Sequence, residues 1–454
     1  MGGPRRICHP HLDAKEVVLS SFTAEAVARL AGPEWLQRRR EAAFQRFSMT
    51  PLPTVEEEVW RYSRIPELDL DDYAPLVGDR PVTDTIPAEL VQEQERLGAC
   101  SAMVVVANGR ILRVDVDDAV AASGVQVGSL GELDPDGSSL GSLTGEAPNA
   151  FGQLHDAFTP DQVLVRIPAG VVVPDPIAVL HWTDADHSAS FPHLVVEAGA
   201  NSEVVVYDHA ASADVDALVF PVVELHAGPA ARLRYVHAQV LGPRVWQLGR
   251  QLSRVERDAN FSTAMVALGA DYGRLEVESV LAGKGSSGEM LAVYFGEHGQ
   301  MHDFRSLQDH LAPRTTSNLL FKGAVQGHSR SVYTGLIHIG KEAAGVDAFQ
   351  TNRNIKLSDG AWAESVPNLE IENNDVHCSH ASAVGPVDED QRYYLESRGV
   401  PPMAAERLIV LGFFEEVLER LAVPAAAPAL RAEIAAKLAR RQLDVPPTQV
   451  AADA

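Results

Sequence analysis

The stretch LVVEAGANSEVVVYDHA, residues 194–210, carries the pattern that decides the fold. Val204 and Val206 fall on one face of an extended chain, and Glu203 and Val205 fall on the other, which is the two-residue period of a β-strand. Similar runs follow one another from about residue 160 to 385, and no helical period of useful length separates them. This region is therefore predicted to be built of consecutive strands.

Turn dipeptides recur along the same region. Those at positions 199–200, 228–229 and 258–259 are spaced by 29 and 30 residues, and further ones follow at 285–286, 323–324 and 360–361. Strands without crossover helices do not form a doubly wound sheet, which leaves a sandwich, a barrel or a stacked β-solenoid. Short repeated strands with small residues at their corners favour the solenoid, because each coil buries its inner face on the next.

Helical patterns flank the strand-rich region. Apolar residues recur at three- and four-residue steps from Trp35 to Phe47, and Pro51 ends that helix. Thr54 with Glu57 is typical of a capping box, which predicts a second helix over 54–65. The expected organisation is a helical N-terminal region (1–75), a mixed connecting region (76–160), a β-helix core (161–386) and a helical C-terminal domain (387–454).

Capping residues also delimit the C-terminal helices. Asp388 with Gln391 indicates a helix start, Gly399 suits its end, and Pro402 opens the next helix. An apolar stripe is predicted along that next helix, consisting of Leu408, Leu411, Val417, Leu418 and Leu421.

Charge and composition restrict the function. The formal net charge of −24 disfavours nucleic-acid binding and anionic membrane surfaces. The densest basic cluster, Arg38 to Arg40, is predicted to be a solvated helix face. No run of about 18 apolar residues occurs, and three widely spaced cysteines do not form a disulfide framework, so a cytoplasmic location is expected.

A nucleotide signature is missing from the sequence. Lys284 follows Gly283, but a phosphate loop needs a glycine five residues before Gly283, and that position is Glu278. We therefore expect this chain neither to bind a nucleotide nor to hydrolyse ATP.

One short stretch concentrates soft metal ligands. In NNDVHCSHASAVG, residues 373–385, Cys378 and His380 would point to the same side of a strand, and His377 would point to the other. A thiolate and an imidazole side by side suit iron, zinc or copper, and they are also half of a nucleophile pair. A buried structural cysteine with a hydrogen-bonded histidine is equally compatible with the pattern.

The remaining histidines and cysteines carry weaker signals. The spacing of His298, His302 and His310 matches no ligand motif, so each is expected to be satisfied or exposed. Cys8, with His9 nearby, is expected in an unstructured N-terminal tail, and Cys100 is expected in the core.

The sequence from 349 to 421 resembles the SufB/SufD family of iron–sulfur cluster assembly proteins. The matching motifs are QTNRN (350–354), LSDGA (357–361), PNLEI (367–371), NDVHCSH (374–380), VGPVDEDQ (384–391), SRG (397–399) and GFFEEVLERL (412–421). The CSH form is the SufD form. Two positions depart from the usual pattern: Ala381 replaces a glycine and Ala383 replaces a threonine. An alanine at 381 indicates that this backbone need not be left-handed.

The resemblance implies a right-handed parallel β-helix flanked by helical domains. It also implies a non-catalytic scaffold that pairs with SufB through the β-helix ends and docks the ATPase SufC on its C-terminal helices. A transient iron–sulfur cluster would form at the junction, with His380 as a ligand and Cys378 beside it. Some complexes of the family bind a flavin, but no residue here places one, and the isolated chain could pair with itself. The alternatives are a stand-alone metal- or thiol-dependent enzyme using Cys378 and His380, or a purely structural subunit.

Overall fold

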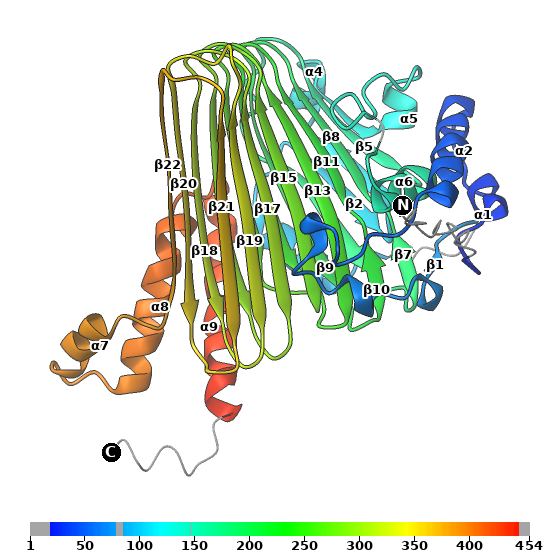
Figure 1. Cartoon of the computed structure of the whole chain (residues 1–454). Helices are drawn as coiled ribbons and strands as arrows, with labels where there is room; N and C mark the ends of the chain where they lie inside the picture. Colours follow the sequence, from blue (N-terminus) through cyan, green and yellow to red (C-terminus); the bar gives the residue numbers. More distant parts are fainter. Residues whose placement is uncertain (1–18, 79–84, 146, 445–454) are drawn as a thin grey trace, which may run out of the picture.

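Two β-sheets form the body of the molecule in the computed structural model, which describes residues 19–78, 85–145 and 147–444. The chain passes alternately between the sheets and winds a β-solenoid of about eight turns. Helices lie beside the solenoid at both ends of the chain (Figure 1). The predicted mainly-β solenoid with helical flanks is therefore confirmed.

Within the described residues, each sheet has a simple strand order. Sheet A runs β21 (Trp362–Ile371), β19 (Arg330–Ile339), β17 (Met301–His310), β15 (Tyr272–Leu281), β13 (Val245–Val255), β11 (Val222–Ala227), β8 (His193–Ala198), β5 (Gln162–Ile167) and β4 (Gln126–Ser129). The short strands β1 (Ala74–Pro75), β7 (Ser188–Ser190) and β10 (Ala217–Val219) join the side of sheet A. Sheet B runs β22 (Val376–Gly385), β20 (Val346–Lys356), β18 (Thr316–Val325), β16 (Ser287–Gly296), β14 (Asn260–Ala267), β12 (Arg232–Val240), β9 (Glu203–Ser212), β6 (Ile177–Thr183), β2 (Ala102–Ala107) and β3 (Arg110–Val116).

The helices fall into two groups and a few connecting turns. The N-terminal part contains α1 (Ala24–Ala28), α2 (Glu34–Met49), α3 (Ala88–Leu97), α4 (Asp118–Ala122), α5 (Leu130–Leu133) and α6 (Ala150–Phe158). The C-terminal part contains α7 (Glu389–Glu396), α8 (Pro402–Leu418) and α9 (Ala427–Asp444). Short 3-10 turns occupy Glu58–Trp60, Ile65–Glu67, Leu70–Asp72 and Pro424–Ala426.

One corner of each coil contains a left-handed residue. Asn201, Ala230 and Asp258 have φ values of 55°, 57° and 58°. Their N–H groups donate to a carbonyl of the next coil, as Ala230 does to Arg257 at 2.8 Å. The corners therefore stack through hydrogen bonds of their own and carry the strand register from coil to coil.

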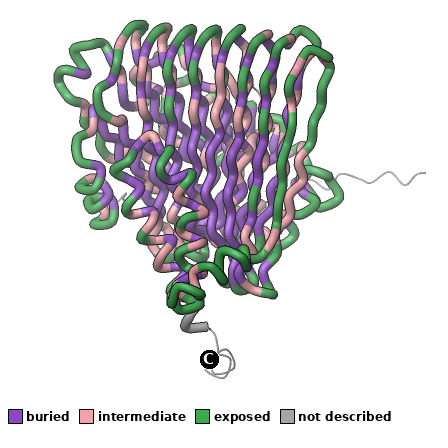
Figure 2. Tube along the Cα trace, turned by 90° about the vertical axis from the view of Figure 1, so that its left-hand side faces the viewer, coloured by how far each residue is buried: buried purple, intermediate pink, exposed green. Residues whose placement is uncertain are grey.

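The length of a coil follows from the pairing of Asn260 with Ser287 and of Thr316 with Asp347, and it lies between 27 and 31 residues. The predicted turn at 323–324 is wrong, because both residues lie inside β18. A Cβ on Gly323 would lie 2.0 Å from the ring of Tyr294, so this glycine makes room for an aromatic side chain. The middle of the coils is buried, whereas the loops that join the strands are exposed (Figure 2).

The N-terminal end of the solenoid is covered. β3 pairs antiparallel with β2, and β4 pairs antiparallel with β5. The segment between these strands packs Val120, Val125 and Val127 against the solenoid core. Because terminal coils need a cap to cover their apolar inner face, this segment acts as the cap of the solenoid.

The N-terminal helices correct one prediction about charge. Arg38 is exposed, but Arg40 is completely buried and donates to the carbonyls of Thr159, Pro160 and Ala31 at 2.7 to 3.0 Å. The expectation of a wholly solvated basic face is therefore wrong. Arg40 ties α2 to the segment that enters the solenoid.

The helix predicted over 54–65 is also wrong. Glu57 accepts the N–H of Thr54 at 3.0 Å, as in half of a capping box, but only a 3-10 turn follows. The carbonyl of Val59 instead accepts hydrogen bonds from Arg274 (3.0 Å) and Arg305 (3.1 Å) on sheet A. These contacts hold the segment as a strap on the outer face of the sheet.

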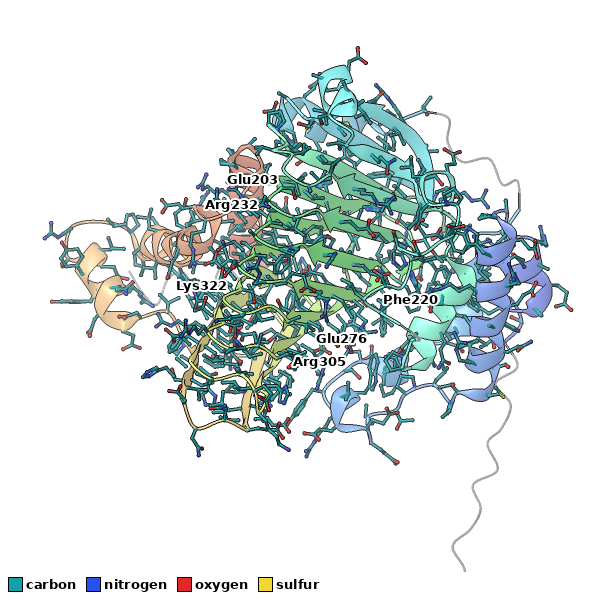
Figure 3. All side chains as sticks on the ribbon, turned by 90° about the horizontal axis from the view of Figure 1, so that it is seen from above. Glu203, Phe220, Arg232, Glu276, Arg305 and Lys322 are labelled. Atoms are coloured by element: carbon teal, nitrogen blue, oxygen red, sulfur yellow. The ribbon has the colours of Figure 1, made fainter. Side chains whose placement is uncertain are left out.

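The C-terminal helices cover the opposite face of the solenoid. Figure 3 shows Lys322 on the side facing these helices, and Phe220 and Glu276 on the side facing the N-terminal ones. Asp388 caps α7 by accepting from the N–H groups of Asp390 and Gln391, as predicted. Leu408 departs from the predicted stripe because it is 53% exposed.

Candidate functional site

The last coil leaves both sheets with a bare edge. Within the described residues, β21 pairs only with β19, and β22 pairs only with β20. The unpaired N–H and C=O groups of such an edge are ready to pair with another strand. This end of the solenoid, called the open end below, contrasts with the capped N-terminal end.

The strand register places Cys378 and His380 on the inner side of the open end. Cys378 pairs with Ala348 and His380 pairs with Gln350, and both partners are buried. His377 instead pairs with Asp347 on the outer side. The prediction that Cys378 and His380 share one side of a strand, away from His377, is therefore confirmed. Ala381 is not left-handed, as its substitution for a glycine indicated.

Cys378 and His380 differ in their surroundings. His380 is exposed, whereas Cys378 is half-buried and packs against an apolar cluster that includes Ile337 and Val346. Burial raises the pKa of the Cys378 thiol. A protonated thiol is a poor nucleophile, so this environment does not activate Cys378.

Polar groups that the sequence did not reveal lie close to His380. Ser382 donates to Ser365 at 2.7 Å and so links β22 to β21. Beneath His380, the amide of Gln350 is buried, and neither Oε1 nor Nε2 has a hydrogen-bond partner. The neighbouring Tyr333 hydroxyl lies 2.8 Å from Ser306 Oγ. Only the pairing of distant strands brings these residues together, and the motif QTNRN alone gave no signal for Gln350.

Apolar side chains surround the polar centre. Leu369 and Ile371 of β21 continue the inner rows of the buried residues Ile337 and Ile339 and are 38% and 44% exposed. Val384 of β22 is 41% exposed. Inner-row side chains of this kind are covered by the next coil elsewhere in the solenoid, so the open end is an apolar surface with a polar centre.

Other candidate groups are dispersed. Among residues 19–78, 85–145 and 147–444, no group of three or more histidine, cysteine, aspartate or glutamate side chains could hold a metal ion. His302 and His310 are buried in the solenoid, and His298 is exposed at a corner. Lys284 lies at a corner between β15 and β16, where a strand and not a helix follows. Cys100 is half-buried against the core, while Cys8 and its neighbouring histidines lie outside the described residues.

The fold and the site define an open-ended β-solenoid subunit that has a cysteine and a histidine on its last coil. Residues 181–413 match the family model for the SUF system FeS cluster assembly, SufBD core domain, and residues 22–179 match the SufBD protein N-terminal region. The chain belongs to the SufB/SufD family of iron–sulfur cluster assembly proteins.

Several relatives carry the same family name, "Iron-sulfur cluster assembly SufBD family protein". The one from Mycobacterium tuberculosis is 36% identical over 297 residues, which cover 63% of this chain and 72% of the relative. The one from Mycobacterium leprae is 34% identical and covers 70% and 81%. A more distant one from Staphylococcus epidermidis is 24% identical over 86% of both chains. No helix in the part of the chain that the structure describes is long and apolar enough to cross a membrane.

Proposed function

We propose that this chain is the SufD-like, non-catalytic subunit of a cytoplasmic iron–sulfur cluster assembly complex, and that its open end pairs with a SufB-like subunit. The observation that carries the proposal is the position of His380 and Cys378 on the inner side of the last coil, between two bare sheet edges. A partner solenoid could continue both sheets and cover the exposed inner rows that contain Leu369 and Ile371.

The nascent cluster, which is the cargo of the complex, would then form at the junction. His380 is the exposed donor and offers an imidazole nitrogen, while Cys378 is deeper and would ligate only after losing its proton. Because clusters are usually held by four ligands, two donors from this chain would bind weakly without the partner. A weak, shared site suits a scaffold that passes its product on.

The C-terminal helices would dock a SufC-like ATPase. A groove between α7, α8 and the ends of β20 and β22 is lined by Arg353, Ile355, Tyr394, Leu408 and Phe413, among others. Tyr393, Tyr394, Met403 and Leu408 are all more than half exposed. Exposed aromatic and aliphatic side chains around a groove are typical of an interaction surface.

The test is co-purification of the chain with its SufB-like and SufC-like neighbours, followed by anaerobic iron–sulfur reconstitution. The variant His380→Ala should keep the complex and lose most of the cluster absorbance. Unchanged cluster formation by this variant would remove His380 from the proposed site.

A second arm tests the pairing surface. Ile371→Glu places a charge on the open end and should weaken SufB-like binding at least tenfold, because a buried unpaired carboxylate is costly at an interface. Val114→Glu is the matched control, since Val114 is 38% exposed on β3 at the opposite, capped end. Equal effects of the two substitutions would contradict pairing through the open end.

A further inference from the structure

The buried amide of Gln350 is unusual within its own inward-facing row. The row passes through Met290, Leu319 and Gln350 and ends at His380, and the first three of these are at most 2% exposed. Two apolar residues thus precede one glutamine, and the glutamine lies directly beneath the histidine. A leucine in its place would continue the apolar packing of the row.

Leaving a buried amide unpaired is expensive. Both polar atoms of Gln350 are buried without a hydrogen-bond partner, and each such atom costs about 1–3 kcal/mol relative to a satisfied one. A residue that served only to fill space would not need this group. The amide therefore points to a partner that binds it in a working state of the site.

The interior holds the amide close to β22. A Cβ placed on Gly335 would lie 2.2 Å from Tyr333 Oη and 2.3 Å from Gln350 Nε2, so both side-chain tips reach the space that this glycine leaves free. With Nε2 on the side of Tyr333, Oε1 is the remaining acceptor of the amide. The adjacent residue on the edge strand is His380.

We infer that Gln350 is a positioning residue for His380: its Oε1 accepts the N–H of one ring nitrogen, which leaves the lone pair of the other nitrogen directed out of the open end. A histidine that ligates a metal commonly donates its other N–H in this way, which fixes the tautomer and the ring orientation. This inference rests on the proposed function only for what the free nitrogen binds. The contact between Gln350 and His380 belongs to this chain alone.

The test uses the full-length isolated chain labelled with ¹⁵N-histidine, and the His380 signals are assigned by their loss in His380→Ala. Wild type should show one dominant tautomer of His380. Gln350→Leu should give a mixture of tautomers, and Gln350→Glu should raise the pKa of His380 by roughly one unit or more, because a carboxylate stabilises the charged ring. Unchanged His380 signals in both variants would overturn the inference.

Matched variants separate positioning from folding. Gln251→Leu removes another buried inner-facing glutamine, whose Oε1 accepts from Thr263 at 3.1 Å, and it should leave His380 unchanged. Gln350→Met provides a second apolar replacement if the leucine variant fails to fold. A His380 response to Gln251→Leu as large as the response to Gln350→Leu would also overturn the inference, since the effect would then be a general loss of packing.

Measurement in the complex distinguishes the two proposals. Gln350→Leu should lower the cluster yield several-fold, but less than His380→Ala, because the imidazole is still present. If the tautomer changes in the isolated chain while neither variant affects the cluster, the positioning role stands and the proposed cluster site fails. If the cluster depends on His380 but the tautomer ignores Gln350, the opposite holds.

Discussion

Gly335 shows how tightly the last coils are packed at the level of single residues. It lies in β19, where its missing side chain leaves room for the tips of Tyr333 and Gln350. Its conformation is not left-handed, so the requirement is for space and not for backbone freedom. Glycine is therefore needed here because of side chains that come from another coil.

Gly335→Ala should destabilise the chain by about 1–3 kcal/mol, because the added methyl overlaps two buried side chains. Gly385→Ala is the matched control: Gly385 is also in a strand, and a Cβ placed there meets no atom within 4 Å. Denaturant unfolding followed by circular dichroism measures both variants. Equal unfolding midpoints would show that the interior around Gln350 can relax.

At the level of elements, α8 is held to sheet B by a buried lysine as well as by apolar contacts. Lys322 of β18 donates to the carbonyl of Phe413 at 2.8 Å and pairs with Glu416, and its side chain is 5% exposed. Its ammonium also lies 4.6 Å from the centre of the Phe413 ring. The helix that lines the proposed ATPase groove is thereby fixed to the strands behind the open end.

Lys322→Met should loosen α8 without unfolding the solenoid. A hydrogen bond to a charged group contributes about 1.5–3 kcal/mol, so amide exchange in α8 should accelerate by roughly 10- to 100-fold. Glu416→Gln should change the exchange rate much less, because Glu416 is 56% exposed and exposed ion pairs contribute about 0–1 kcal/mol. Hydrogen exchange resolved to peptides tests both variants, and equal protection of α8 in wild type and Lys322→Met would contradict this role.

At the level of the whole molecule, the solenoid interior excludes charge from its histidines. Burial, helped by the nearby Lys437 ammonium, lowers the pKa of His302 to about 3. Burial, helped by His338, lowers the pKa of His310 to about 4. Both groups are therefore neutral in the folded chain at physiological pH, while an unfolded chain binds protons below about pH 6.5.

These shifts predict a loss of stability in acid. Because the folded pKa is the lower one, the stability is complete above about pH 6.5 and declines as the pH falls toward the folded value. His302 alone should contribute a loss of about 2 kcal/mol between pH 7 and pH 5. His302→Leu should reduce the difference between unfolding midpoints measured at these two pH values, whereas His298→Asn at an exposed corner should not. An identical pH dependence in wild type and His302→Leu would contradict the prediction.

The sequence by itself was sufficient for the features that depend on neighbouring residues. The two-residue period around Val204, the recurring corners and the caps at Asp388 and Pro402 predicted the solenoid and its flanking helices, because strand and cap signals act over a few positions. The parity of a strand likewise placed Cys378 and His380 on one side. The family motifs added the expected role of these two residues.

Tertiary structure alone decided which distant residues meet. Arginines of sheet A bind the carbonyl of Val59 and prevent the helix that the local capping signal predicted. Arg40 is buried because carbonyls more than a hundred residues away accept its protons. Gln350 lies under His380 because one coil takes 30 residues at that point, and coil length is the sum of many corner and strand contacts. Local propensity cannot encode that register, since it arises only when each coil stacks on the one before it.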